Sequence, residues 1–347
     1  MAELKDIRNI VTLRRIDDIT PIPNADRIET AHIGGWSIVV GKGQHQIGDE
    51  VYFFEIDAFL PVELPQFKDL AQRGTKIVPN PKTGKMVEGH VLKTARLRGQ
   101  YSQGLIKDIG EFDSQPTEQD DISAYFEGLG VFKYEKPLPQ DISTLGQYPS
   151  HLTRPTDSPR IQNLDDDFLA SLDPSEWVAT EKIDGTSTTI MKDAETGKLR
   201  LLSRRLELDI DSLPPGHYYR LILNQYPFED LLEPGEIIKG ETFGPKLQGN
   251  PLKVNKVSFA LFDWENFHRP LPLELEALKV PVYDEFTLPN TVIGCVEQVN
   301  KLKSKINPKV NAEGVVWWNT TGKVYSELKD RPNFKAINNQ YLLKNDR

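Results

Sequence analysis

Short runs of β-branched and aromatic residues, separated by glycine-containing turns, dominate the first 135 residues of this 347-residue chain. The clearest example is residues 34–57, GGWSIVVGKGQHQIGDEVYFFEID, in which WSIVV and EVYFF are separated by Gly-Lys-Gly and Ile-Gly-Asp. Such runs predict short strands joined by tight turns, and several of them in succession predict a small barrel. The chain is long enough for a second domain with a core of its own.

The second half of the chain has a different pattern. Proline is dense between residues 136 and 159, which predicts a linker. Strand-forming runs then resume as WVATEKI, TSTTIMK, KLRLLSR, EIIKGETFG, KVSFALFDW and EGVVWW, with DAETGK as a hairpin turn between two of them. Apolar residues spaced by three and four predict helices in LELEALKV (residues 273–280) and CVEQVNKLKSKI (residues 295–306). This half is therefore predicted to be α+β, with mostly antiparallel strands.

Composition excludes several classes of protein. There is no apolar run of about 18 residues, as a transmembrane helix would need, and MAELKDIRNI lacks the pattern of a signal peptide. The one cysteine, Cys295, excludes an internal disulfide, and its apolar surroundings favour a buried, inert thiol. A cytoplasmic protein without a membrane partner is expected. The net charge of −9 argues against wholesale coating of nucleic acid but permits a local basic groove.

One basic stretch could form such a groove. HVLKTARLRGQYSQG, residues 90–104, carries Lys93, Arg96 and Arg98 at near-alternate spacing beside Tyr101. Basic side chains on one strand face with an adjacent aromatic ring could hold a single nucleic-acid strand. A solvated strand face explains the pattern equally well.

Lys182 lies in TEKIDGTSTTI, at the mouth of an Asp-Gly turn between two strand-forming runs. It is either a solvated turn residue or a nucleophile at the edge of a cleft. A nucleophilic lysine must lose its proton, which costs about 4–5 kcal/mol at neutral pH from an ordinary pKa near 10.4. Desolvation or a neighbouring cation lowers that cost. A divalent metal held by carboxylates would be such a cation.

Acidic residues recur beside glycine at the ends of predicted strands: Asp184 in KIDG, Glu241 in KGETFG and Glu313 in AEGVVWW. Each alone is typical of a solvated strand end, but with a downstream lysine in NFKAINNQYL they form an ordered set. Other nucleotide or hydrolase motifs do not fit. GPKLQGNP has Asn250 where a P-loop needs lysine, and no zinc spacing or GxSxG elbow occurs.

This ordered set resembles the covalent nucleotidyltransferase superfamily of ATP-dependent polynucleotide ligases and mRNA capping enzymes. EKIDG looks like motif I, LLSRR like motif Ia, IKGETFGP like motif III, FALFDWEN like motif IIIa, NAEGVVWW like motif IV and NFKAINNQYLLK like motif V. In DNA ligases and capping enzymes an OB domain follows motif V, and here only a few residues do. PNADRIE, GW and GD in the first part instead resemble OB-like barrels of tRNA-binding and ligase-associated domains.

An OB-like domain before the ligase motifs, with RIQNL ahead of motif I, resembles the Naegleria-type ATP-dependent RNA ligases. The resemblance implies an OB-like β-barrel over residues 1–135, the Pro-rich linker over 136–159 and a nucleotidyltransferase domain over 160–347, built of antiparallel sheets with flanking helices. It also implies that the OB domain assists the adenylylation step.

The resemblance assigns roles to individual residues. Lys182 would carry AMP through a phosphoramide bond, Arg160 would contact the nucleotide phosphate, and Arg204 the ribose or the RNA terminus. Lys335 would contact the α-phosphate. Position 337, where many relatives have a second motif V lysine, is Ile337, and Lys329 is the candidate substitute.

The resemblance also implies residues that would bind nucleotide or metal. Glu181 would bind nucleotide, and Phe243 either packs against adenine or is a simple core aromatic. Asp184, Glu241 and Glu313 would position Mg²⁺ or Mn²⁺ through its waters, and Glu241 and Glu313 would also face the nucleotide.

The function implied is ATP-dependent joining of 3′-hydroxyl and 5′-phosphate RNA ends through a lysyl-adenylate and an RNA-adenylate, at nicks in duplexes. The alternatives are a GTP-dependent mRNA capping guanylyltransferase or a DNA ligase of the same superfamily, which the missing C-terminal OB domain argues against. A third alternative is an inactive tRNA-binding protein with a decayed ligase domain. Retention of Lys182 together with Asp184, Glu241 and Glu313 argues against it.

Overall fold

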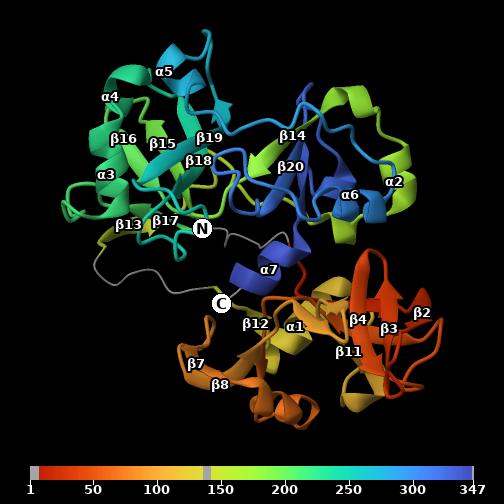
Figure 1. Ribbon diagram of the computed structural model, residues 1–347. Helices are drawn as coiled ribbons and strands as arrows, with labels where there is room; N and C mark the ends of the chain where they lie inside the picture. Colours follow the sequence, from red (N-terminus) through yellow and green to blue (C-terminus); the bar gives the residue numbers. More distant parts are fainter. Residues whose placement is uncertain (1–7, 136–141, 346–347) are drawn as a thin grey trace. The chain divides into compact units, whose positions relative to one another are not determined.

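A computed structural model describes residues 8–135 and 142–345 (Figure 1). These residues divide into two compact units. The N-terminal unit contains residues 8–135, and it also takes in Gln162–Asp165 and residues 342–345. The C-terminal unit contains residues 142–161 and Asp166–Tyr341. The chain therefore enters the N-terminal unit again at two points far from its first 135 residues.

The N-terminal unit is built almost entirely of strands. They are β1 (Val11–Arg15), β2 (Asp18–Pro21), β3 (Ile28–Ile33), β4 (Trp36–Gly41), β5 (Glu50–Phe54), β6 (Ala58–Pro61), β7 (Lys76–Pro79), β8 (Met86–Val91), β9 (Ala95–Leu97), β10 (Gln100–Ser102), β11 (Leu105–Asp108) and β12 (Phe132–Lys133). The helical segments are η1 (Pro65–Arg73), η2 (Ile109–Glu111) and α1 (Gln119–Gly128). The strands pair antiparallel in the orders β1-β5-β11, β2-β3-β4, β12-β6-β8-β7 and β10-β9.

Strand β5 lies between two apolar clusters of this unit, which explains why four successive residues, 51–54, are all buried. Successive side chains of a strand point to opposite faces. Tyr52 and Phe54 therefore pack with helix α1, whereas Val51 and Phe53 pack with the cluster around Trp36. In β4 only alternate residues are buried. The predicted strands WSIVV and EVYFF are both confirmed.

The C-terminal unit contains two antiparallel sheets. Its strands are β13 (Thr144–Gln147), β14 (Trp177–Lys182), β15 (Thr186–Lys192), β16 (Leu199–Leu202), β17 (Leu206–Leu208), β18 (Ile237–Phe243), β19 (Ser258–Glu265), β20 (Gly314–Asn319) and β21 (Asn333–Ile337). One sheet has the order β13-β17-β16-β15-β18-β19 and the other β14-β20-β21. Consecutive strands β14 and β15 thus belong to different sheets, and the KIDG turn joins them.

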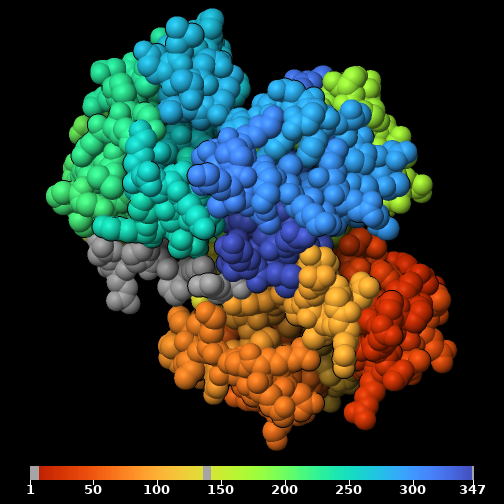
Figure 2. All heavy atoms as spheres, in the orientation of Figure 1, coloured from red at the N-terminus to blue at the C-terminus, as the bar shows by residue number. Residues whose placement is uncertain are grey.

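Short helices flank these sheets (Figure 1). They are α2 (Asp166–Ala170), α3 (Tyr218–Gln225), α4 (Phe228–Leu231), α5 (Leu273–Glu276) and α6 (Val292–Gln298), with 3-10 segments η4 (Pro174–Glu176) and η5 (Ser326–Leu328). The 3-10 segment η3 (Ile161–Asn163) and helix α7 (Asn339–Asn345) each begin in this unit and end in residues that group with the N-terminal unit. Residues of α3, α4 and α5 form one buried apolar cluster with residues of β15, β16, β18 and β19. In the space-filling view a notch separates these segments, green to cyan, from those around β20 and α6, blue (Figure 2).

The α+β class with mostly antiparallel strands is confirmed, but both predicted helices are shorter than their apolar spacing indicated. Helix α5 ends at Glu276 because the chain then pairs with β19, where the Val280 amide donates to the Leu261 carbonyl. Helix α6 ends at Gln298 because Lys301 adopts a left-handed conformation (φ 61°). No helix in the described ranges is long and apolar enough to cross a membrane.

The predicted linker over residues 136–159 lies partly outside the described residues, which omit 136–141. In the described part, Thr144–Gln147 forms β13 and pairs with β17 at the edge of the six-stranded sheet. This segment is therefore a strand of the C-terminal unit, which proline content did not indicate. The domain boundaries drawn from the sequence stay predictions.

Candidate active site

Lys182 is the last residue of β14, where it pairs with Gly314 at the start of β20. This register brings the lysine beside Glu313, and its Nζ atom lies 2.7 Å from each carboxylate oxygen of Glu313. Burial alone would lower the pKa of Lys182, but the negative charges of Glu313, Glu241 and Asp184 together raise it. In this state the lysine is a cation held by carboxylates.

Two glycines of the acidic motifs let neighbouring backbones come close at this point. A Cβ atom on Gly185 would lie 2.1 Å from the Thr242 carbonyl oxygen, and one on Gly314 would lie 2.1 Å from the Ala336 carbonyl oxygen. Any side chain at either position would force the strands apart. The acidic-residue-plus-glycine pattern in the sequence therefore has a physical basis. The glycine permits the close strand approach that the adjacent carboxylate needs.

Glu241 enters the site from the other sheet. It lies on β18 opposite Ser187 of β15. Burial raises the pKa of Glu241 to about 8, and repulsion from Glu313 and Asp184 adds to this effect, whereas Lys182 opposes it. Repulsion among these buried carboxylates therefore makes it unfavourable for all of them to be ionised at the same time.

Such a crowded set of oxygens fits a hard divalent cation, whose charge would relieve the repulsion. Within residues 8–135 and 142–345, however, no three His, Cys, Asp or Glu side chains gather closely enough to bind a metal directly. The expectation that Asp184, Glu241 and Glu313 hold a metal through its waters stays a prediction.

Asp184 has a partner that the sequence did not reveal. The hydroxyl of Tyr341, on α7, donates to Asp184 Oδ2 at 2.5 Å. Burial and then the charge of Asp184 raise the pKa of Tyr341, so the phenol stays protonated and remains a donor. Tyr341 lies within the motif V string NFKAINNQYLLK, but no local pattern indicates which carboxylate it would reach.

Arg160 and Lys335 are brought together by the backbone. The two residues form an isolated parallel bridge, and the Lys335 amide donates to the Pro159 carbonyl at 2.8 Å. Burial raises the pKa of Glu313, and the positive charges of Lys182 and Lys335 oppose that rise. The structure thus places the predicted α-phosphate contact, Lys335, within electrostatic reach of the nucleophile's carboxylate partner.

Arg204 lies in the turn between β16 and β17. Its Nη2 atom contacts Asp157 Oδ1 at 2.5 Å, and its charge opposes the rise in the pKa of Glu241. Asp157 lies in the segment whose prolines predicted a linker, and no sequence pattern indicated that it would contact Arg204.

Three predicted nucleotide-binding residues have local roles in the structure. Glu181 is 2% exposed, and its carboxylate accepts from the Lys305 amide at 2.7 Å. Phe243 is 5% exposed in an apolar cluster with Ile183, which fits the core-aromatic alternative. Lys329 is exposed and ends η5 in the left-handed conformation, with φ 57°. Their nucleotide contacts stay predictions.

The basic stretch does not form one strand face, so that expectation is wrong. Arg96 lies on β9 opposite Tyr101 of β10, with its guanidinium 5.7 Å from the ring centroid. Arg98 lies in the tight turn that joins these strands (φ 49°), and Lys93 precedes β9. Lys93 instead borders a cavity of about 480 Å³, which Arg73, Lys76 and His90 also line. Basic residues do gather in this unit, but on a hairpin and around a cavity.

Two protein-family models match the chain. One, described as an OB-fold domain, matches residues 10–109, and the other, described as RNA ligase, matches residues 175–337. No curated protein matches the sequence. The order of the two domains agrees with the order predicted from the motifs.

Solved structures of RNA ligase from Naegleria gruberi are similar over nearly the full chain. An apo point mutant has 27% sequence identity and a TM-score of 0.79, covering 99% of this chain and 100% of that one. A second mutant, solved with ATP and Mn, has 27% identity and a TM-score of 0.76 over 98% and 100% of the chains. The same values apply to a structure of that ligase with PPi.

Proposed function

We propose that this chain, which belongs to the ATP-dependent RNA ligases, joins a 3′-hydroxyl RNA end to a 5′-phosphate end through a lysyl-adenylate on Lys182. The observation that supports this most is the contact of Lys182 Nζ with Glu313, 2.7 Å long, where the two sheets of the C-terminal unit meet. Backbone pairing with Gly314 fixes the Cα atom of Lys182, and the contact with Glu313 holds its Nζ atom.

In the proposed first step, the neutral Lys182 amine attacks the α-phosphorus of ATP, and pyrophosphate departs in line with the new N–P bond. The proton leaves Nζ before or during attack, and Glu313 is the carboxylate in contact with that atom. Lys335 and Arg160 would neutralise charge on the phosphates. A divalent cation at Asp184, Glu241 and Glu313 would supply further positive charge to the phosphates and lower the pKa of the amine.

The two later steps use the same site. The AMP moiety passes from Lys182 to the 5′-phosphate of RNA, which turns that phosphate into one with a good leaving group. The 3′-hydroxyl then attacks the activated phosphate and AMP departs. Such displacements depend mainly on positioning and electrostatics. The charged groups around Lys182 therefore suffice, and the protein needs no second nucleophilic side chain. We place this reaction in a reducing compartment such as the cytoplasm, because Cys295 is a buried free thiol.

Substrate choice tests the proposed function. With a nick held by a complementary strand, we expect efficient sealing when the 3′-hydroxyl side is RNA. Replacing its terminal ribonucleotides by deoxynucleotides should slow sealing strongly, because the 2′-hydroxyl and A-form geometry mark RNA, and Arg204 is a candidate contact there. The same replacement on the 5′-phosphate side should matter less. Sealing rates would be measured side by side on four nicks: RNA on both sides, DNA on the 3′-hydroxyl side only, DNA on the 5′-phosphate side only, and DNA on both sides.

Sealing should not depend on base sequence and should weaken as salt rises, since phosphate contacts carry no sequence information. Equal rates on all-DNA and RNA-ended nicks would overturn the choice of RNA and leave only ligase chemistry. Transfer of GMP to a diphosphate RNA end, without sealing, would favour the capping alternative.

Removal of the N-terminal unit gives a second prediction. A fragment beginning at Ile142, so that β13 is retained, should fold but form little lysyl-adenylate from ATP, and it should still seal a pre-adenylylated end to some degree. This fragment loses the N-terminal residues that contact Gln162 and Asn163. Circular dichroism would establish folding, and labelled ATP would report adenylylation. Full reactivity with ATP would show that the N-terminal unit is only an RNA-binding accessory.

A further inference from the structure

The N-terminal unit contains a cavity whose residues have no part in the proposed reaction. Its volume is about 480 Å³, and it is lined by residues of β4, η1, β7 to β11 and the loop before β9. All of these residues belong to the N-terminal unit. Sites for small molecules typically measure about 300–1,000 Å³. The cavity is therefore large enough for a small molecule or for one unit of a polymer.

The charged side chains that line this cavity are all basic. They are Arg73, Lys76, His90 and Lys93, and no aspartate or glutamate of the described residues lines it. The whole chain has the opposite bias, with 51 acidic residues against 42 lysines and arginines. An exposed carboxylate, that of Glu88, accepts from the hydroxyl of the lining residue Thr75 at 2.6 Å. A lining of this kind favours an anionic ligand.

Two of the basic groups are held in place by neighbours in the same unit. The ammonium group of Lys76 lies 5.0 Å from the centroid of the Tyr134 ring and 3.5 Å from its hydroxyl. His90 Nδ1 lies 2.7 Å from the Gly74 carbonyl oxygen. Because a carbonyl only accepts, Nδ1 carries a proton, and Nε2 is the ring nitrogen that can meet a ligand. Side chains held before binding lose less conformational freedom when a ligand arrives.

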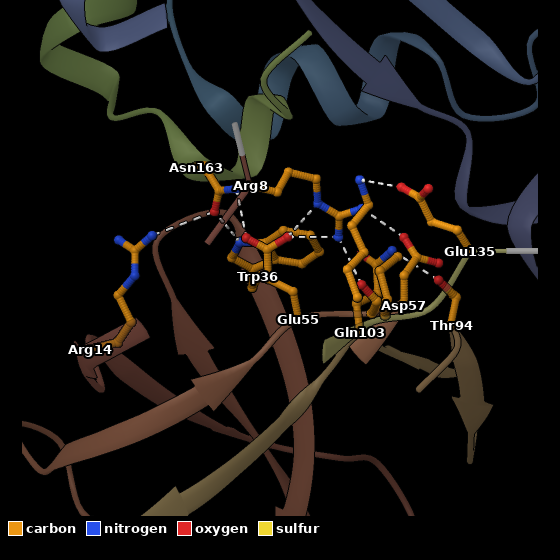
Figure 3. Close-up of polar contacts among 11 residues, drawn as sticks. Arg8, Arg14, Trp36, Glu55, Asp57, Thr94, Gln103, Glu135 and Asn163 are labelled. Atoms are coloured by element: carbon orange, nitrogen blue, oxygen red, sulfur yellow. Dashed lines mark hydrogen bonds and ion pairs between the residues drawn. The ribbon is translucent and has the colours of Figure 1, made fainter. Parts of the chain in front are cut away.

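Two buried hydroxyl groups line the same cavity. Thr94 is 7% exposed and accepts from Gln103 Nε2 at 3.2 Å (Figure 3). Ser102 is 8% exposed and accepts from the Val39 amide at 3.0 Å. A hydroxyl that accepts one hydrogen bond can still donate its own proton. Both side chains can therefore donate to oxygen atoms of a ligand.

Aliphatic side chains form much of the remaining wall. Leu70 and Leu92 are buried in an apolar cluster of this unit, whereas Leu97 lies on β9 and Leu105 on β11. An inorganic anion would gain nothing from such a wall. A nucleotide has a phosphate for the basic groups and a base whose flat face can pack against leucines. The cavity thus combines the two kinds of contact that a nucleotide needs.

We infer that this cavity binds one nucleotide of an RNA strand, with Lys76 and Lys93 at a backbone phosphate and the base against the aliphatic wall. The inference rests on the proposed function, because that function makes RNA the polymer that the protein meets. Phosphate and aliphatic contacts do not distinguish the bases, so the site adds affinity without selecting sequence. A free nucleotide carries the same chemical groups, and the experiments below separate the two.

The first test measures RNA binding by the full chain in the absence of ATP. The probe is a fluorescein-labelled RNA of about ten nucleotides, within the usual site size of such domains, with a 5′-hydroxyl end that cannot be adenylylated. We expect the Lys76→Ala, Lys93→Ala double variant to bind at least about tenfold more weakly than wild type, and equally so for RNAs of different sequence. Fluorescence anisotropy would give the dissociation constants.

The salt dependence of binding shows whether these lysines meet phosphates. The slope of log affinity against log salt should become shallower by about 1.4 in the double variant, since each phosphate contact to a single strand contributes about 0.7. The matched control is Lys82→Ala, Lys85→Ala. It removes the same charge from two exposed lysines of the β7–β8 turn that do not line the cavity, and it should leave the slope unchanged.

A second pair of variants changes the cavity without removing a lysine. Leu97 lines the cavity and is 37% exposed, so a polar side chain is compatible with the fold there. Leu97→Glu brings a negative charge to the basic lining, and Leu97→Gln is the uncharged control of similar size. We expect Leu97→Glu to bind RNA about threefold more weakly than Leu97→Gln. Circular dichroism would establish that each variant is folded.

Calorimetric titration with ATP separates an RNA nucleotide from a free one. Loss of one ATP site in the Lys76, Lys93 variant, with unchanged RNA affinity, would assign the cavity to a free nucleotide and overturn the inference. A wild-type RNA affinity and salt slope in that variant, or an equal effect of the Lys82, Lys85 control, would overturn it as well. Failure of the proposed function is a different result, because the wild-type protein would then form no lysyl-adenylate, whatever its affinity for RNA.

Discussion

Replacing Lys182 by alanine should abolish the covalent adenylate that the wild-type protein forms with ATP and a divalent metal. Replacement by arginine should abolish it as well. Arginine would preserve the positive charge beside Glu313, but its guanidinium does not deprotonate at accessible pH and so cannot attack phosphorus. Incubation with α-labelled ATP, followed by denaturing electrophoresis, would measure the labelled polypeptide directly.

The same assay with α-labelled GTP separates a ligase from a capping enzyme, since ATP alone should label the protein. Both Lys182 variants should still join a nick whose 5′ end is already adenylylated, at a rate reduced by the lost charge. Label that persists in Lys182→Ala would disprove the assignment of the nucleophile, whatever the sealing activity.

Replacing Glu241 or Glu313 by alanine should each lower adenylylation by at least about a hundredfold, the usual scale for one group that stabilises transition-state charge. Glu313 contacts the nucleophile directly, and Glu241 is a buried carboxylate whose pKa is raised to about 8 by burial and by neighbouring carboxylates. Single-turnover rates at saturating ATP would check both variants.

The matched control is Glu207→Ala. Glu207 is also a strand glutamate paired with a cation, Arg200, but it lies on β17 and should leave the rate within about twofold of wild type. The prediction would be contradicted if a folded variant with both Glu241→Ala and Glu313→Ala formed the adenylate at nearly the wild-type rate. Both residues would then be ordinary charged residues at strand ends.

The sign of the pH dependence separates two roles for Glu313. The carboxylates around Lys182 raise its pKa, so Glu313→Gln should lower that pKa and shift the rise of rate with pH toward lower pH. If Glu313 only held the lysine protonated, this variant would be faster at neutral pH. We expect it to be slower, because the variant also loses the charge that we propose to position the metal.

The sequence alone predicted the strands that carry the site and the residues that meet there. The runs WVATEKI, TSTTIMK and EGVVWW became β14, β15 and β20, because alternation and β-branched content are local properties that a strand preserves. The ordered motifs around Lys182, Asp184, Glu241 and Glu313 predicted a shared site. The structure shows a contact of Lys182 with Glu313 and an effect of Glu313, Glu241 and Asp184 on the pKa of Lys182; the catalytic roles of these residues stay predictions.

Tertiary structure alone decided which distant side chains complete these arrangements. Tyr341 reaches Asp184, Asp157 reaches Arg204, and Asn163 is bound by Trp36 and Glu55. None of these pairs follows from periodicity, since hydrogen-bond partners far apart in the chain are set by how sheets and turns pack. The sequence thus determined the chemistry of this protein, because a nucleophile and its carboxylates must be encoded as residues in order. Packing decided how firmly each group is held, because burial and partner choice exist only in the folded chain.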